Sequence, residues 1–169
     1  MAIEEAAYKV IMKEGDFELR QYEPITVAVT QESDIKGGNG FNKLFDYING
    51  NNQTSTKISM TAPVLNNLEQ KQLSIAFIMP HHYDTRTLPA PLNTEIQLKE
   101  IPGRQVAAVI FSGNVNSEKI ALKKKELSEW LRGKQISVTG LFELARYNPP
   151  FIPGFIKHNE LLVEVQLDI

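Results

Sequence analysis

The sequence of 169 residues contains no cysteine. This absence excludes disulfides, cysteine-ligated zinc, iron–sulfur clusters and thiol catalysis together. An excess of basic residues is also missing, because 18 Lys and Arg stand against 20 Asp and Glu, for a net charge of -2. Binding to nucleic acid or to an anionic membrane needs a basic stripe. We therefore expect no nucleic-acid partner.

Long apolar runs are absent as well. No stretch approaches the ~18 apolar residues of a membrane span, and the first 20 residues carry acids where a signal peptide has basic residues. The motifs G-x-S-x-G and H-E-x-x-H, which mark common hydrolases, do not occur. These absences favour a cytoplasmic, non-enzymatic protein with no membrane span, and we expect a monomer.

Strand-like segments open the chain, at 8–13, 17–23 and 25–30. A helix is predicted next, because Phe41, Leu44, Phe45 and Ile48 follow the spacing i, i+3, i+4, i+7. The helix should end at Asn49-Gly50, where glycine suits a left-handed C-terminal cap. Strands are predicted at 57–64 and 73–80, and a linker loop at 81–93.

The same order of elements then returns. We predict strands at 96–101 and 106–111, a helix at 117–132 with Ser117 as its N-cap, and strands at 143–147 and 160–167. The two helices also match in sequence, since KLFDYING (43–50) aligns with ELSEWLRG (126–133). We therefore predict an α+β fold of duplicated strand–strand–helix–strand–strand units, about 7–80 and 94–168, in a single domain over 1–169. A cleft where the two halves meet is a natural ligand site.

Several polar and apolar groups allow two interpretations. The glycine-rich stretch 37–40 is a flexible lead into the first helix, or its backbone N–H groups hold a carboxylate. His81 and His82 are neighbours at a strand end and point to opposite sides, so exposed loop histidines are the favoured interpretation. Phe41 and Phe45 are core residues, or one edge of their face lines a cleft.

The segment FIPGFIKHNE (151–160) is also ambiguous. It is a loop that packs on the core, or a flap that places Phe155 and Ile156 against a ligand and Lys157 or His158 near an anionic group. Glu160, Tyr147 and His158 could gather as acid–base groups of an enzyme. The favoured alternative is that Asn159-Glu160 fixes the loop through backbone hydrogen bonds.

Five blocks of the chain resemble the SOUL/haem-binding protein family. They are FELRQYEP (17–24), GFNKLFDYINGNN (40–52), KISMTAPV (57–64), IAFIMP (75–80) and ARYNPPFIPGFIKHNELLVEV (145–165). The chain is also similar to GyrI-like effector-binding domains. The resemblance implies a distorted β-barrel or paired antiparallel sheets flanked by two helices.

The resemblance further implies non-covalent binding of haem or another tetrapyrrole in an apolar cleft between the first helix and the loop before the last strand. By position, the expected ligand-binding residues are Phe41, Phe45, Met60, Phe151, Ile152, Phe155, Ile156, Lys157 and His158. Where some members carry a possible axial histidine this chain has Gln21, and Gly38 and Asp46 stand where a related type has basic residues. We therefore expect haem binding without a strong axial protein ligand. The alternative is an effector-binding or protein-interaction domain for another small hydrophobic ligand.

Overall fold

The structure is a computed structural model, and it describes residues 3–33, 38–68, 73–148 and 153–168. The helices are α1 (Asn39–Ile48) and α2 (Ser117–Gly133), with one turn of 3-10 helix, η1 (Gly154–Ile156). The strands are β1 (Glu4–Glu5), β2 (Tyr8–Glu14), β3 (Phe17–Tyr22), β4 (Ile25–Gln31), β5 (Thr61–Ala62), β6 (Val64–Asn67), β7 (Ser74–Ile78), β8 (Gln97–Ile101), β9 (Arg104–Ser112), β10 (Ser137–Arg146) and β11 (His158–Gln166).

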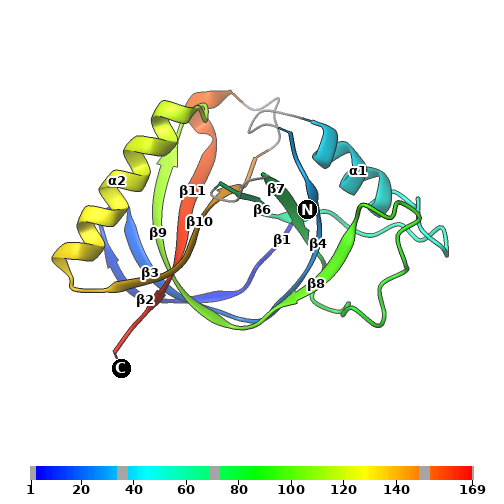
Figure 1. The fold of residues 1–169 in the computed structure, drawn as a ribbon, viewed down its shortest axis with the longest axis horizontal. Coiled ribbons are helices and arrows are strands. Elements are labelled where there is room, and N and C mark those ends of the chain that lie inside the picture. The colour runs from blue at the N-terminus through cyan, green and yellow to red at the C-terminus, as the bar shows by residue number, and fades with distance from the viewer. Residues whose placement is uncertain (1–2, 34–37, 69–72, 149–152, 169) are drawn as a thin grey trace.

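Nine strands form one antiparallel sheet in the order β2-β3-β9-β11-β10-β6-β7-β4-β8. The sheet bends into a trough and does not close into a barrel, with α2 outside one wing and α1 outside the other (Figure 1). This arrangement confirms the predicted α+β class with two flanking helices. The single domain and the duplication stay predictions. No helix in the described part of the chain is long and apolar enough to cross a membrane.

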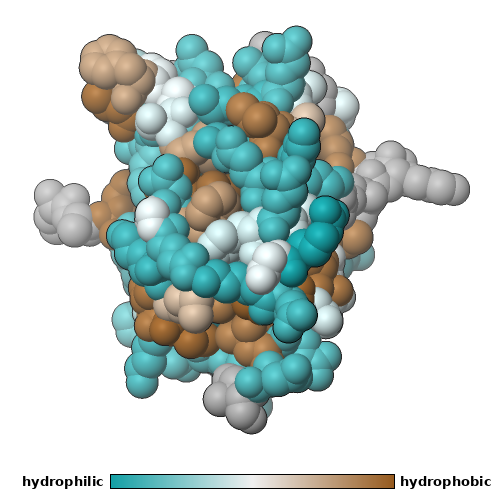
Figure 2. All heavy atoms as spheres, turned by 90° about the vertical axis from the view of Figure 1, so that its left-hand side faces the viewer, coloured by the Kyte–Doolittle hydropathy of each residue, from teal (hydrophilic) through white to brown (hydrophobic). Residues whose placement is uncertain are grey.

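Neighbouring residues of a strand face opposite sides of the sheet. In the described residues, the buried apolar side chains therefore form clusters on both sides of the sheet. Leu127 and Leu131 of α2 pack on the outer side of β9, β10 and β11, and Leu44, Tyr47 and Ile48 of α1 pack on β4 and β7. A third cluster, with Leu65, Ile78 and Leu162, lies on the inner side of the trough. The surface on the α2 side is mostly hydrophilic, with hydrophobic patches between (Figure 2).

Most predicted elements are confirmed to within a few residues, and both helices are present. The strand predicted at 57–64 is wrong in its extent. Within this range only Thr61–Ala62, which form β5, and Val64, which begins β6, belong to strands. Pro63 has no N–H to donate to a ladder, so it divides β5 from β6. The predicted N-cap Ser117 is also wrong: the cap is Asn116, whose side chain accepts a hydrogen bond from the Lys119 amide at 2.8 Å.

Candidate ligand-binding site

The apolar face of α1 is partly core and partly open. Phe41 lies edge-on to Phe77 at 5.1 Å between ring centroids and packs on the buried cluster beneath the helix. Phe45 stacks on Phe41 at 6.1 Å, with 11° between the ring planes, and 47% of its surface remains exposed. Met60 packs on the same cluster and is half-buried. Phe41 is therefore partly core, as one interpretation expects, and Phe45 is open to solvent, while its role in a ligand cleft stays a prediction.

The segment before β11 presents a second open apolar group. Phe155 is 80% exposed and Ile156 is 56% exposed, both in η1, and Lys157 follows half-buried. Phe151 and Ile152 lie outside the described residues. Among the described residues, no ring contact joins Phe155 to Phe41 or Phe45. The start of α1 and the orange-red segment before β11 both lie along the upper edge of Figure 1.

His158 is directed into the trough. It is the first residue of β11, and its Nε2 lies 2.8 Å from Oε2 of Glu160. Its backbone N–H donates to Asn148 Oδ1 at 2.5 Å, and its ring meets Tyr147 edge-on at 4.7 Å. The imidazole therefore holds the base of the segment that carries Phe155 and Ile156.

Glu160 lies at the centre of a buried polar network. Arg20 donates to both of its carboxylate oxygens, at 2.6 and 2.9 Å, and Tyr147 Oη donates to Oε1 at 3.1 Å. Arg20 also donates through Nε to Glu18 at 2.9 Å and through Nη1 to the Tyr22 hydroxyl at 2.9 Å. The Arg20 side chain is fully buried, so these hydrogen bonds satisfy a charge that water does not reach.

The electrostatics of this network keep its charges fixed at neutral pH. Burial alone would raise the pKa of Glu160, but hydrogen bonds from Arg20 and His158 outweigh it and hold the pKa at about 2. Burial, with the nearby Glu160 charge, raises the pKa of Tyr147 well above its ordinary value. Glu160 is therefore a carboxylate and Tyr147 a neutral phenol.

The structure brings together the three residues considered as acid–base groups. A carboxyl group with a pKa of about 2 is a weak base, and a phenol with a strongly raised pKa is a weak acid. The geometry therefore suits holding a segment in place better than proton transfer. The expected backbone anchor is present only in part: Asn159 Nδ2 donates to the Gly113 carbonyl at 2.9 Å, whereas Glu160 binds side chains.

The start of α1 already carries a carboxylate of the chain itself. The Gly40 N–H donates to Glu32 Oε2 at 3.0 Å, and the Ser33 N–H donates to Oε1 at 3.0 Å. Glu32 is only 5% exposed. Glu32 thus supplies the carboxylate that the start of this helix was expected to be able to hold. Its negative charge lies at the favourable end of the helix dipole.

Two of the positions at which the resemblance led us to look for a histidine or a basic residue form hydrogen bonds within the chain. Gln21 Nε2 donates to the backbone carbonyl of Arg104 at 3.3 Å, and Asp46 accepts a hydrogen bond from Asn51 at 2.6 Å. Sequence reasoning missed the network residues of β3. Glu18, Arg20 and Tyr22 are polar at every second position, so they share one face of that strand, and this alternation was the available signal.

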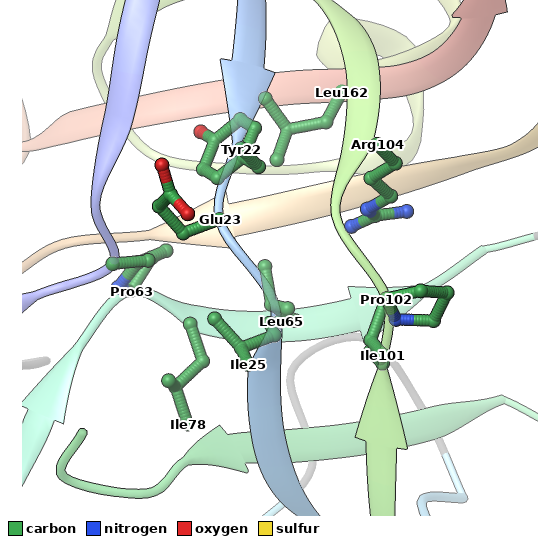
Figure 3. A pocket seen from close by; sticks show the side chains of 11 residues that line it. Tyr22, Glu23, Ile25, Pro63, Leu65, Ile78, Ile101, Pro102, Arg104 and Leu162 are labelled. Atoms are coloured by element: carbon green, nitrogen blue, oxygen red, sulfur yellow. The ribbon is translucent and has the colours of Figure 1, made fainter. Parts of the chain in front are cut away.

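A small pocket lies between the two wings of the trough (Figure 3). Its floor is aliphatic, with Ile25, Leu65, Ile78 and Leu162, and Ala6 of the N-terminal segment also lines it. At its rim, Arg104 forms a bidentate pair with Glu143 at 3.0 and 3.1 Å. That the two wings correspond to the two predicted repeat units stays a prediction.

The chain belongs to the SOUL haem-binding protein family: the family model described as "SOUL heme-binding protein" matches residues 3–164. The chain is 29% identical over 149 residues to human "Heme-binding protein 2", a match that covers 80% of this chain and 72% of that protein. Haem binding is thus established at the level of the family, as the sequence predicts.

Solved structures show the same fold at low identity. The C-terminal domain of EcmrR superposes with a TM-score of 0.69 at 12% identity, covering 95% of this chain and 99% of that one. A structure described as a hydrolase from Listeria innocua gives 0.64 at 9% identity, covering 92% and 94%. SAV2435, solved with bound tetraphenylphosphonium, gives 0.50 at 10% identity, covering 89% and 93%. These similarities concern the fold alone.

Proposed function

We propose that the protein binds haem or a related flat tetrapyrrole, without enzymatic turnover, between α1 and the segment before β11. The observation that carries the proposal is the open aromatic edge of α1, where Phe45 stacks on a half-buried Phe41. Met60, Phe155, Ile156 and Lys157 are the further contacts that we propose. A planar macrocycle matches such apolar groups, which otherwise face water.

Apolar contact can supply most of the affinity. Each ~100 Å² of apolar surface removed from water contributes about 2.5 kcal/mol. An exposed ion pair, such as Lys157 with a propionate, contributes only ~0–1 kcal/mol. The lack of basic residues at Gly38 and Asp46 therefore weakens binding only modestly.

The proposal includes no strong protein ligand to the iron. Gln21 Nε2 donates to a backbone carbonyl, and His158 Nε2 lies 2.8 Å from Glu160 Oε2, so these two atoms already have partners within the chain. The apolar residues of α1 and η1 suit the faces of the ring. We propose no reaction step for the bound group. Porphyrins with and without iron should thus bind alike.

The test is a parallel titration of ferric haem and metal-free protoporphyrin, followed by Soret absorbance and by quenching of Trp130. We expect one saturable site for each ligand at micromolar concentration, with dissociation constants within tenfold, which is about 1.4 kcal/mol. No saturable signal from either porphyrin contradicts the proposal. Binding of haem alone would instead indicate a ligand to the iron.

The second candidate is an effector-binding domain for another small hydrophobic ligand. It is motivated by the pocket between the wings and by SAV2435, which holds tetraphenylphosphonium on a similar fold. Native mass spectrometry of the protein from its own host separates the two candidates. A retained small molecule that is not a tetrapyrrole favours the second candidate.

A further inference from the structure

Two lysines come together beside Gly113, at the end of the segment that we propose as one wall of the ligand site. His158 pairs with Ser112 in the ladder of β11 and β9, so Lys157, one residue earlier, comes opposite Gly113. A Cβ on Gly113 would lie 4.0 Å from Nζ of Lys119, the third residue of α2. The fold thus brings a cation of α2 and a cation that follows η1 to the same glycine.

Both lysines lie on the outer side of the sheet. Lys157 is extended, with φ of −70° and ψ of 134°, and its neighbour His158 is directed into the trough. Because neighbours in an extended chain face opposite sides, Lys157 faces outward, the side on which α2 carries Lys119. Both residues are half-buried, and no carboxylate of the described residues forms an ion pair with either of them. Their charges are therefore available to carboxylates from outside the chain.

The other wall of the proposed site carries the opposite charge. Asp46 follows Phe45 on α1, is exposed, and accepts a hydrogen bond from a neutral amide at 2.6 Å. Lys43 of the same helix is already paired with Glu95 at 3.0 Å. No basic residue lies in the last turn of α1, where the helix dipole is negative. A carboxylate of a ligand is thus disfavoured along α1 and favoured beside Gly113.

We propose that Lys119 and Lys157 bind the propionate carboxylates of the tetrapyrrole, and that the edge of the ring without carboxylates lies against α1. This inference rests on the proposed function and defines the ligand class more narrowly, as tetrapyrroles that carry carboxylates on one edge only. A macrocycle with a carboxylate on every pyrrole ring would place one of them against Asp46.

Charge pairs at the surface have a limited but measurable effect. Each exposed ion pair contributes up to about fivefold in affinity, so the two lysines together should contribute on the order of tenfold. Salt screens such pairs and leaves apolar contact in place. The affinity for a dicarboxylate porphyrin should therefore fall as salt is raised, whereas the affinity for its uncharged ester should not.

The test titrates three metal-free porphyrins into the full chain at low and at high salt, followed by Soret absorbance. They are protoporphyrin, whose propionates lie on neighbouring rings, its dimethyl ester, and coproporphyrin, which has a propionate on every ring. We expect the wild type to bind protoporphyrin at least about tenfold more tightly than coproporphyrin. The double variant Lys119→Gln, Lys157→Gln should lose about tenfold in affinity for protoporphyrin, with its salt dependence, and bind the ester as the wild type does.

Two further variants complete the comparison. Asp46→Lys should bind coproporphyrin several-fold more tightly than the wild type does, because the repulsion becomes an attraction. Lys57→Gln is the matched control, since Lys57 is an exposed lysine that bridges Asn49 at the end of α1 and should have no effect on protoporphyrin.

Equal affinity for protoporphyrin in the wild type and in the folded double lysine variant overturns the proposal. An equal loss in Lys57→Gln also overturns it, because the effect would then reflect the overall charge of the protein. Saturable binding of protoporphyrin that none of these variants alters defeats this inference and leaves the haem proposal standing. Absence of binding by all three porphyrins to the wild type overturns both.

Discussion

Arg20 and Glu160 form a bidentate ion pair across the inner face of the sheet, with side chains that are 0% and 2% exposed. Arg20 belongs to β3 and Glu160 to β11, and β9 lies between these strands. The Glu160 carboxylate also contacts His158, which lies two residues after the end of η1. The pair therefore ties an early strand of the chain to the base of the proposed ligand-binding segment.

Removal of one partner should be strongly destabilising. Glu160→Ala leaves the Arg20 guanidinium buried with Glu18 as its remaining carboxylate, and breaking a buried pair costs ~3–5 kcal/mol. Urea unfolding at pH 7, followed by Trp130 fluorescence, measures the loss. Glu95→Ala is the matched control, because it breaks the exposed pair with Lys43 and should cost at most ~1 kcal/mol. An equal loss of stability in the two variants would contradict the importance of the buried Arg20–Glu160 pair.

Acid should weaken the fold through the same carboxylate. The pKa of Glu160 is about 2 when folded, against 4.5 for the unperturbed group, so the unfolded chain binds the proton more readily. Its stabilisation is therefore fully present above pH 4.5 and is lost as the pH falls toward 2. Urea unfolding of the wild type and of Glu160→Gln over pH 2–6 should show a shallower pH dependence in the variant. Parallel curves would exclude Glu160 as the source.

Periodic segments of the sequence predicted most of the fold. Phe41, Leu44, Phe45 and Ile48 fixed the first helix at the right place, and Gly50 follows it with a φ of +111°, as a C-terminal glycine should. The failures lie where the pattern carried no such period. Segment 57–64 is rich in β-branched residues but contains Pro63, and the two-residue strand β1 has an unremarkable sequence.

The site was less accessible to sequence reasoning than the fold. Glu160, Tyr147 and His158 are close in the chain, so their meeting could be considered from spacing alone. Arg20 is 140 positions from Glu160, and only the pairing of β3 and β11 with β9 brings the two together. Likewise, nothing in the glycine-rich stretch indicates that Glu32 caps α1.

Close packing at the start of α1 predicts an unusual effect of alanine. A Cβ on Gly40 would lie 2.6 Å from Ile75, 2.8 Å from the Gln31 carbonyl oxygen and 2.9 Å from Glu32. Gly40→Ala should therefore destabilise by ~1–3 kcal/mol, as overpacking does, although alanine favours helices. Gly133→Ala at the end of α2 meets nothing within 4 Å and should be neutral or stabilising by up to ~1 kcal/mol. Thermal unfolding of the two variants provides the comparison.

The absorption spectrum of the ferric haem complex tests whether His158 ligates the iron. Because its imidazole lies against Glu160, His158→Gln should leave the Soret maximum and the ligand-field bands of the ferric haem complex unchanged. The affinity for haem should also stay within tenfold of the wild-type value. A shift of the Soret band in the variant would show that His158 turns to the iron in the complex.

A flat tetrapyrrole that lies against the open aromatic edge of α1 should bind poorly when that edge carries a charge, and haem titration of two charge-substituted variants measures this most directly. Phe45→Glu places a carboxylate on that edge, whereas Leu122→Glu places one on α2 at a side chain of nearly equal exposure, 49% against 47%. We expect Phe45→Glu to weaken haem binding at least tenfold and Leu122→Glu to leave it unchanged. Equal haem affinity in the two folded variants would show that the tetrapyrrole does not lie against α1.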